Sequence, residues 1–317
     1  AQAGIEIPSL CYLDDIEPPV SCFICVVKIQ KVNKLMPSCV ALAQEGMVVE
    51  TDTEEIRQYR KQALELLLSD HVGDCEGPCE NGCPAEMDIP LMIRQIAKGK
   101  LDRAIVTIKR SIPLPAVLGR ICPALCEKVC RRTDKDESVA ICLLKRFVAD
   151  YDLQSEKPYM PVCASPSGKK IAIVGGGACG LSAAYYLAQK GHHCTVFDKN
   201  EKPGGELRNP EFLKAGLTLD IIDQEIDLIL KLGIDFQGKH KLGDQLIIQQ
   251  IKSEYDAVFL ATGNPEVHSL VNLQLEQNEG KLLVNRETWQ TSDPQIFAGG
   301  EVIGDRQMCV RAVADGR

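Results

Sequence analysis

Residues 170–180 read Lys-Ile-Ala-Ile-Val-Gly-Gly-Gly-Ala-Cys-Gly, an apolar run that passes directly into a glycine loop. The apolar run is typical of a buried parallel strand, and Leu181–Gln189 follows it with a helical pattern. A second apolar run, Cys194–Phe197, ends at Asp198, 18 residues after Gly180. Glycines let the backbone approach a pyrophosphate at a helix N-terminus, and the carboxylate binds ribose hydroxyls. The stretch therefore predicts the opening βαβ unit of a dinucleotide-binding domain, without telling one dinucleotide from another.

Three further segments of the same half narrow the choice of dinucleotide. Gly204-Gly205 lies just after the second strand, Tyr255–Gly263 is a strand ending in Ala-Thr-Gly, and Thr291–Glu301 contains Ile-Phe-Ala-Gly-Gly-Glu. Together these segments resemble the FAD domain of the glutamate synthase small subunit and of disulfide-reductase-like flavoproteins. The resemblance implies that FAD is bound by Gly175, Gly177, Ala178, Gly180, Asp198, Gly204, Gly205, Thr262, Gly263, Gly300 and Glu301. The family usually has Asp where Glu301 stands, as a hydrogen-bond partner of the ribityl chain, and Glu reaches the same chain from one methylene further out.

No redox-active thiol pair accompanies these flavin segments. Neither C-x-x-C nor C-x4-C occurs beside them, so disulfide exchange is not expected. The remaining cysteines of this half are interpreted as small fillers: Cys163, Cys179, Cys194 and Cys309. No catalytic acid, base or nucleophile is identified, and electron transfer needs none.

The cysteines are distributed very unevenly along the 317 residues. Eleven of the 15 lie before residue 150 in short spacings, whereas a secreted disulfide scaffold is short and has cysteines throughout. Metal ligation explains this asymmetry better. The net charge of −8, from 36 basic and 44 acidic residues, argues against a nucleic-acid surface. No apolar run reaches the roughly 18 residues of a membrane span, and residues 1–13 do not read as a signal peptide.

Cys11, Cys22, Cys25 and Cys39 form the pattern C-x10-C-x2-C-x13-C. A C-x2-C loop supplies two thiolates from a single turn, and four thiolates suit an iron–sulfur cluster. Structural zinc is the alternative, although zinc sites usually pair two such loops. The segment resembles the plant-type ferredoxin domain of iron hydrogenases and of the complex I iron–sulfur subunit. This resemblance implies a 2Fe–2S cluster on the four cysteines. It also implies a β-hairpin before the first ligand, so we expect the N-terminus to be truncated.

Two further groups of cysteines follow, Cys75-x3-Cys79-x3-Cys83-Pro84 and Cys122-Pro123-x2-Cys126-x3-Cys130. Over roughly residues 70–150 the chain resembles the two-cluster helical domain of the glutamate synthase small subunit and of dihydropyrimidine dehydrogenase. The matching residues include Asp88-Ile89-Pro90, Gly119-Arg120-x-Cys122-Pro123 and Arg146-Phe147-Val148. The resemblance implies two 4Fe–4S clusters with crossed ligands. One cluster takes Cys75, Cys79 and Cys130, and the other takes Cys83, Cys122 and Cys126.

Including Cys142, this block has seven cysteines, whereas two four-coordinate clusters need eight ligands. His71 is the candidate eighth ligand because it lies four residues before Cys75, and the alternative is a solvated helix-end histidine. The resemblance places a Gln or Glu ligand at Lys145, and an ammonium group cannot ligate iron. Cys142 lies one helical turn earlier on the same face, so a thiolate there replaces that ligand.

The sequence thus predicts a multidomain α/β and α+β protein. We expect a small β-grasp-like ferredoxin domain over residues 1–52, a helical two-cluster domain over 53–154 and a Rossmann-like FAD domain over 170–317. Residues 155–169 contain three prolines and a Ser-Pro-Ser-Gly run, which favours a linker. Thr53–Ser69 reads as a helix, and Asp88 as the cap of another.

Relatives of the FAD domain carry a nicotinamide domain between the Ala-Thr-Gly turn and the last FAD segment. Only about 27 residues separate Gly263 from Thr291, against the roughly 100 that such a domain needs. Either the domain is excised near Asn264–Asn272, which predicts a chain break there, or evolution has lost it. Relatives also continue past Arg317 into a helix, so we expect the C-terminus to be truncated as well.

These observations predict an oxidoreductase subunit with FAD, two 4Fe–4S clusters and one 2Fe–2S cluster, linked to NAD(P)H when complete. FAD accepts a hydride, and the clusters pass single electrons on. The alternative is an electron-relay subunit without its own nicotinamide site inside a larger redox complex, bifurcating or not. We expect other redox subunits as partners, no nucleic acid, no membrane span, and an anaerobic cytoplasm, where thiolates stay reduced.

Overall fold

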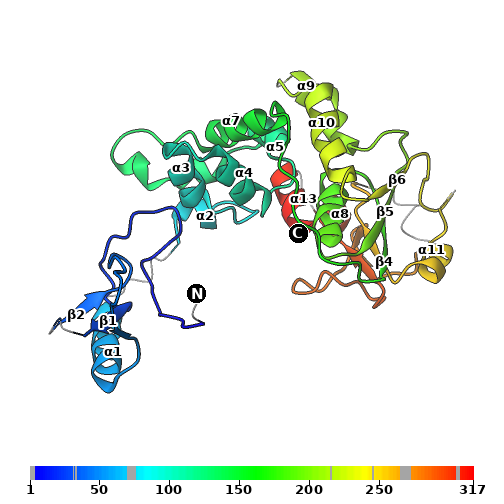
Figure 1. The fold of residues 1–317 in the computed structure, drawn as a ribbon. Coiled ribbons are helices and arrows are strands. Elements are labelled where there is room, and N and C mark those ends of the chain that lie inside the picture. The colour runs from blue at the N-terminus through cyan, green and yellow to red at the C-terminus, as the bar shows by residue number, and fades with distance from the viewer. Residues whose placement is uncertain are drawn as a thin grey trace. The chain divides into compact units, whose positions relative to one another are not determined.

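The computed structural model describes residues 4–30, 32, 34–69, 76–214, 216–244, 246–264, 273–304 and 308–317. The chain divides into two compact units, residues 1–75 and residues 76–317, coloured from blue to cyan and from cyan to red (Figure 1). Within the described residues, no helix is long and apolar enough to cross a membrane.

The first unit combines short antiparallel strands with one long helix. In the part of it that is described, the strands lie in the order β2-β1-β3. Their bounds are β1 Val26–Ile29, β2 Leu35–Pro37 and β3 Val49–Glu50, and the helix is α1 Glu54–Ser69. The helix begins where the hydroxyl of Thr53 accepts a hydrogen bond from the Ile56 amide at 3.2 Å.

Helix α1 packs on strand β1 of its own unit. Ile56 is fully buried, and the Arg60 guanidinium donates to the Val26 carbonyl at 2.9 Å. The helix predicted at Thr53–Ser69 therefore forms, but its contacts are with the strands that precede it. The division between the units accordingly falls after Cys75, whereas the sequence places a domain boundary after residue 52.

The second unit begins with a group of helices around a common apolar core. Their bounds are α2 Pro78–Asn81, α3 Ile89–Ala97, α4 Leu101–Lys109, α5 Pro115–Ile121, α6 Leu125–Lys128, the 3-10 turn η1 Arg131–Asp134 and α7 Ile141–Leu153. As predicted, Asp88 caps α3, with its carboxylate accepting from the Leu91 amide at 2.9 Å. Helices α5 and α7 approach closely at Gly119, where a β-carbon would lie 2.7 Å from that of Arg146.

A parallel sheet forms the rest of the second unit. Within the described ranges its strands lie in the order β10-β7-β4-β5-β6. The bounds are β4 Lys170–Val174, β5 His193–Phe197, β6 Asp235–Gln237, β7 Ala257–Leu260 and β10 Ile296–Ala298. An antiparallel pair, β8 Gln277–Asn278 and β9 Lys281–Leu282, lies apart from it. The strands predicted at residues 170–174 and 194–197 are confirmed, and β5 begins one residue earlier.

Apolar side chains cover both faces of this sheet. One face packs against α8 Ala178–Gln189 and α10 Leu219–Leu230, and the other against α11 Ile248–Glu254 and the β8–β9 pair. The remaining elements are η2 Gly205–Arg208, α9 Pro210–Lys214, η3 Gly300–Ile303 and α13 Cys309–Asp315. The strands are therefore buried on both sides, as their nearly continuous apolar sequences indicate.

Helices and sheet are joined within the second unit by polar and apolar contacts. The carboxylate of Glu225, on α10, accepts from the amides of Ala116 and Val117 at 2.7 and 2.8 Å. Helix α13, drawn in red, lies between α5 and α8 (Figure 1). Its residues Val310 and Val313 belong to the core of the cysteine-bearing helices. The segment predicted as a linker, residues 155–169, is attached to the end of α8, because the Ala164 amide donates to the carbonyl of Gln189 at 2.8 Å.

Candidate cluster and dinucleotide sites

The glycine loop after β4 makes a turn that only glycine permits at two of its positions. Gly175 has a φ of +112°, and a β-carbon there would lie 2.2 Å from the carbonyl oxygen of Ala261. A β-carbon on Gly180 would lie 1.9 Å from the oxygen of Gly175. Gly175 is thus required by the neighbouring residue after β7, and Gly180 by the approach of α8 to the loop.

Gly177 differs from its neighbours, because a β-carbon there would meet no atom within 4 Å. Its φ of −81° is available to any residue. The protein's own packing therefore does not explain this glycine. Open space at the N-terminus of the twelve-residue helix α8 suits the approach of a phosphate group to backbone amides.

Asp198 ends β5 beside this loop and is almost completely buried. Its carboxylate accepts hydrogen bonds from the Gly176 amide at 2.6 Å and from the Asn200 amide at 2.7 Å. Gly204 adds a third contact, since its amide donates to the Gly176 carbonyl at 2.7 Å. The predicted acidic residue and the Gly204-Gly205 pair therefore both lie against the glycine loop.

The remaining FAD segments follow β7, which pairs with β4, and β10, which pairs with β7. Parallel neighbours place their carboxyl ends at one edge of a sheet, so the residues after β7 and β10 lie beside the residue after β4. The Gly299 amide donates to the Leu260 carbonyl at 3.0 Å, which joins the two segments. The hydroxyl oxygen of Thr262 is buried and has no hydrogen-bond partner among the described residues. A buried polar atom of this kind indicates a partner supplied from outside the chain.

Two residues of this edge were missed in the sequence. The Asp315 carboxylate accepts from the Gly300 amide at 3.0 Å. The Lys281 ammonium donates to the Glu301 carbonyl at 2.9 Å and to the Asn264 side chain at 3.0 Å. Neither residue belongs to a motif, and their contacts depend on where α13 and the β8–β9 pair fold back. Spacing along the chain carries no signal for them.

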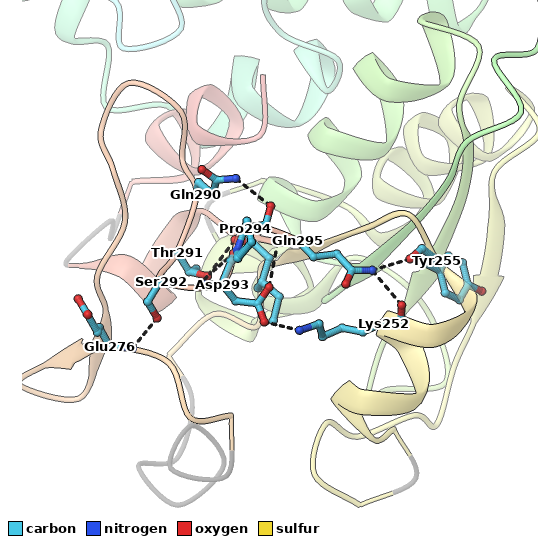
Figure 2. Close-up of polar contacts among 10 residues, drawn as sticks. Lys252, Tyr255, Glu276, Gln290, Thr291, Ser292, Asp293, Pro294 and Gln295 are labelled. Carbon is cyan, nitrogen blue, oxygen red and sulfur yellow. Dashed lines mark hydrogen bonds and ion pairs between the residues drawn. The ribbon is translucent and has the colours of Figure 1, made fainter.

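Thr291 and Ser292 have a structural role at the opposite end of β10. Thr291 accepts from the Asp293 amide at 3.2 Å, and the Ser292 hydroxyl accepts from the Glu276 amide at 3.0 Å (Figure 2). Asp293 also pairs with Lys252, while the Gln295 amide group donates to the carbonyls of Lys252 and Tyr255. These contacts fix the start of β10 in the sheet. Of the segment Thr291–Glu301, only the residues after β10 therefore lie at the carboxyl edge.

The four cysteines of the first set lie close to one another around β1. The Sγ atoms of Cys11 and Cys22 are 3.3 Å apart, and Cys25 forms a hydrogen bond with Cys39. Backbone amides of Cys22 and Ser21 donate to Cys11 and lower its pKa to about 7. Desolvation, together with the hydrogen bond to Cys25, raises the pKa of Cys39 to about 11. Amides that stabilise a thiolate favour a metal-ligating role.

The second unit contains a cluster of four thiols contributed by separate segments. Cys142, on α7, forms hydrogen bonds with both Cys122 and Cys126, and the charge of Cys83 acts on Cys126. The hydrogen bond with Cys142, together with burial, raises the pKa of the Cys122 thiol. The backbone amide of Cys142 is itself held by the Glu127 carboxylate at 2.8 Å.

A second group in the same unit includes Cys79 and Cys130. Burial, with a smaller contribution from the charge of Cys130, raises the pKa of Cys79. The two other ligands predicted for this group, His71 and Cys75, lie outside the described residues. The charge of Cys130 acts on Cys79 and the charge of Cys83 acts on Cys126, in line with the two groups that the family resemblance implies. Iron ligation itself stays a prediction.

The described thiols lie near one another without converging on a single point. In the described ranges, no three Cys, His, Asp or Glu side chains are placed so that one metal ion could bind all of them. An iron–sulfur cluster differs from a single ion because its cysteines ligate separate iron atoms. Thiols gathered from segments far apart in the sequence, and joined by no disulfide, fit that donor set.

Comparison with known proteins decides the family of the chain. Residues 141–316 match the family described as pyridine nucleotide-disulphide oxidoreductase, which is more than half of the chain. The chain belongs to this family. Residues 50–157 match the 4Fe–4S cluster domain II of dihydropyrimidine dehydrogenase, and residues 1–54 match a 2Fe–2S iron–sulfur cluster binding domain. The predicted resemblance is therefore confirmed over all three parts.

Three curated relatives of this chain are named as subunits of oxidoreductases or dehydrogenases. The NADPH-Fe(3+) oxidoreductase subunit beta of Geobacter sulfurreducens is 38% identical over 189 residues, covering 59% of this chain and 28% of the relative. The NADP(+)-dependent formate dehydrogenase subunit beta of Moorella thermoacetica is 38% identical over 209 residues, covering 59% and 29%. The NAD-dependent dihydropyrimidine dehydrogenase subunit PreT of Salmonella typhimurium is 35% identical over 193 residues, covering 59% and 46%. The chain thus spans less than half the length of these relatives.

Proposed function

We propose that this chain transfers electrons between FAD and iron–sulfur clusters, one of which is held in the same compact unit as the FAD segments. The observation that carries the proposal is helix α13. It follows the Gly300–Glu301 segment, its Asp315 binds the Gly300 amide, and its valines pack among the cysteine-bearing helices. A single helix therefore ties the flavin edge of the sheet to the cysteines.

A pocket of about 400 Å³ supports this arrangement. The cysteine-bearing region lines it with Asn81, Gly82, Pro84 and Leu125, and α13 lines it with Arg311, Ala314 and Asp315. Cys83 lies between two of these lining residues in sequence, and Cys126 directly follows a third. The pocket thus lies where the proposed cluster region faces the carboxyl edge of the sheet.

For FAD, the proposed binding residues follow the strand ends. When bound, FAD supplies the conversion between two-electron hydride transfer and single-electron transfer. The loop of Gly175, Gly177, Ala178 and Gly180 would bind the pyrophosphate, because a β-carbon on Gly177, at the start of α8, would meet only open space. Asp198 would bind the ribose beside Gly204-Gly205. The rest of the FAD molecule would be held by Thr262, Gly263, Gly300 and Glu301. The buried Thr262 hydroxyl, which has no partner among the described residues, is the strongest indication of a bound group.

For the clusters, the proposed ligands are the groups that the family resemblance implies, supported by the contacts among the described thiols. We assign a 2Fe–2S cluster to Cys11, Cys22, Cys25 and Cys39. We assign one 4Fe–4S cluster to Cys83, Cys122, Cys126 and Cys142. The other 4Fe–4S cluster would take Cys79 and Cys130 with Cys75 and His71. The β-grasp-like and Rossmann-like assignments, and the bounds 1–52, 53–154, 155–169 and 170–317, belong to the same proposal.

We further infer that the complete protein takes electrons from, or gives them to, NAD(P)H. The names of the three relatives include NADPH, NADP(+) or NAD, which supports this donor class. The segment in which a nicotinamide domain would be inserted, Asn264–Asn272, lies almost wholly outside the described residues.

The test is anaerobic addition of NADH and NADPH to the purified complete protein. We expect one of them to bleach the flavin absorbance, and paramagnetic signals of reduced clusters to appear afterwards. An unchanged flavin spectrum with both nucleotides, in a protein that dithionite reduces fully, contradicts the nicotinamide link. That result favours the alternative, an electron-relay subunit that exchanges electrons with a partner and has no nicotinamide site of its own.

The proposed partners are other redox subunits of a hetero-oligomeric complex, because the first relatives are named as beta subunits. We place the protein in the cytoplasm, where thiols remain reduced and available to iron. Purification of the tagged chain from its source under anaerobic conditions tests the partner, and fractionation of the same cells tests the location. A chain that purifies as a free monomer with full activity contradicts the partner.

A further inference from the structure

Lys145 is a buried lysine whose only hydrogen-bond partner, within the described part of the chain, is a cysteine. Its relative exposure is 3%, and its Nζ lies 4.0 Å from the Sγ of Cys142, one turn earlier on α7. No described carboxylate lies within ion-pair distance of it. A buried ammonium group normally has an anionic partner, because desolvating an unpaired charge is costly.

A second buried lysine in the same core shows the usual arrangement. Lys109 is 5% exposed, and its Nζ lies 2.9 Å from the Asp152 carboxylate. The two lysines therefore have similar burial and different partners. The counter-charge of Lys145 has to come from sulfur.

The thiols around Lys145 are those assigned above to one cluster. Its charge acts on Cys122 and Cys126 as well as on Cys142, and Cys142 forms hydrogen bonds with both of the other thiols. The family resemblance puts a ligand at this position, but an ammonium group has no lone pair for iron. A residue that cannot ligate is thus buried among groups that can.

We propose that Lys145 is a positioning residue whose buried positive charge, and hydrogen bond to the Cys142 sulfur, raise the reduction potential of the cluster on Cys83, Cys122, Cys126 and Cys142. This inference rests on the ligand assignment proposed above. An electron that leaves reduced FAD adds one negative charge to the cluster. A nearby positive charge away from water stabilises the reduced form more than the oxidised form. Hydrogen bonds to the ligating sulfurs act in the same direction.

The test is a redox titration of the complete protein in which the paramagnetic signals of the reduced clusters are monitored. Lys145→Met and Lys145→Leu replace the charged side chain with an apolar one, whereas Lys145→Arg retains the positive charge. In the neutral variants we expect one midpoint potential to become more negative. The equilibrium constant for reduction should fall at least about tenfold, which equals a shift of about 59 mV for a one-electron couple. Lys145→Arg should lie closer to the native protein. Lys135→Gln, at an exposed lysine of the same helical region, should change nothing.

Two results would overturn the proposal. One is an unchanged set of potentials in a neutral variant that retains its iron and sulfide. The other is loss of cluster iron from both neutral variants, which would make Lys145 a structural residue. Failure of the ligand assignment is seen separately, because Cys142→Ala would then keep the full iron content. A potential that shifts in Lys145→Met, in a protein of unchanged iron content, supports the charge effect.

Discussion

Three glycines of one loop illustrate how much a single β-carbon decides. A β-carbon added to Gly175 would lie 2.2 Å from a backbone oxygen, and one added to Gly180 would lie 1.9 Å from another. A β-carbon added to Gly177 would meet only open space. The first two positions are glycine for the fold. The third is explained only by a group that approaches from outside the chain.

This contrast predicts opposite effects for two alanine substitutions. Gly175→Ala should destabilise the folded protein, because a positive φ and a backbone clash act together. Gly177→Ala should fold with an almost unchanged melting temperature and should lose FAD affinity by tenfold or more. Melting of the FAD-free protein and flavin titration separate the two effects. A Gly177→Ala protein that binds FAD as tightly as the native chain would contradict the assigned pyrophosphate position.

At Cys142, the proposed replacement ligand, the prediction concerns iron content. Cys142→Ala should lower the iron content by up to about four atoms per chain, because a 4Fe–4S cluster loses a thiolate. Cys194→Ala is the matched control, since the Cys194 thiol is buried in the apolar core and burial raises its pKa to about 12. Iron and acid-labile sulfide are measured after anaerobic reconstitution. Equal iron content in both variants would exclude Cys142 as a ligand.

At the scale of elements, a buried ion pair holds α4 to the end of α7. The Lys109 ammonium donates to the Asp152 carboxylate and to the Tyr159 carbonyl, and the same carboxylate accepts from the Tyr159 amide. The start of the predicted linker is thereby fixed to two helices. The proline-rich composition that favoured a linker says nothing of these contacts.

Removing one partner of this pair should therefore be strongly destabilising. Asp152→Ala should lower the free energy of unfolding by about 3–5 kcal/mol, because Lys109 remains buried without its counter-charge. Asp136→Ala removes the partner of Arg132 in an exposed pair and should change stability little. Denaturant unfolding of both variants tests the difference. Similar stability of the two variants would show that Lys109 is rehydrated.

At the scale of the whole second unit, Glu225 joins the sheet to the cysteine-bearing helices. Burial raises the pKa of its carboxyl group to about 7, from the ordinary value of 4.5, although the amides of Ala116 and Val117 and the charges of Lys109 and Arg120 oppose the shift. Between these values the folded state holds a proton that the unfolded state has released. The stability contribution of this group is therefore complete below about pH 4.5 and is lost as the pH rises towards 7.

The resulting prediction is a pH-dependent difference between the native protein and Glu225→Gln. The variant cannot ionise, so the native protein should lose stability relative to it by about 3 kcal/mol as the pH rises through this window. The variant should be the less stable of the two at pH 5, because its amide nitrogen cannot accept from Val117. Melting temperatures from pH 5 to 8 test this, with exposed Glu211→Gln as control. A difference that does not vary with pH would contradict it.

What the sequence determined by itself is local. Residues 170–180 specify a strand, a glycine turn and a helix within a few positions, Asp88 caps its helix, and the cysteine spacings separate a 2Fe–2S region from a 4Fe–4S region. Each of these depends on neighbours a few residues away, so spacing along the chain is enough to find it.

Only the tertiary structure decided which distant groups meet. It packed α1 on β1, placed Asp315 on the Gly300 amide, gave Glu225 two amides of another helix, and brought Cys122 and Cys126 to Cys142. These contacts join segments up to about a hundred residues apart and leave no periodic pattern in the sequence. They arise because burial brings separate surfaces together, and a buried polar group then has to bind whatever partner lies opposite.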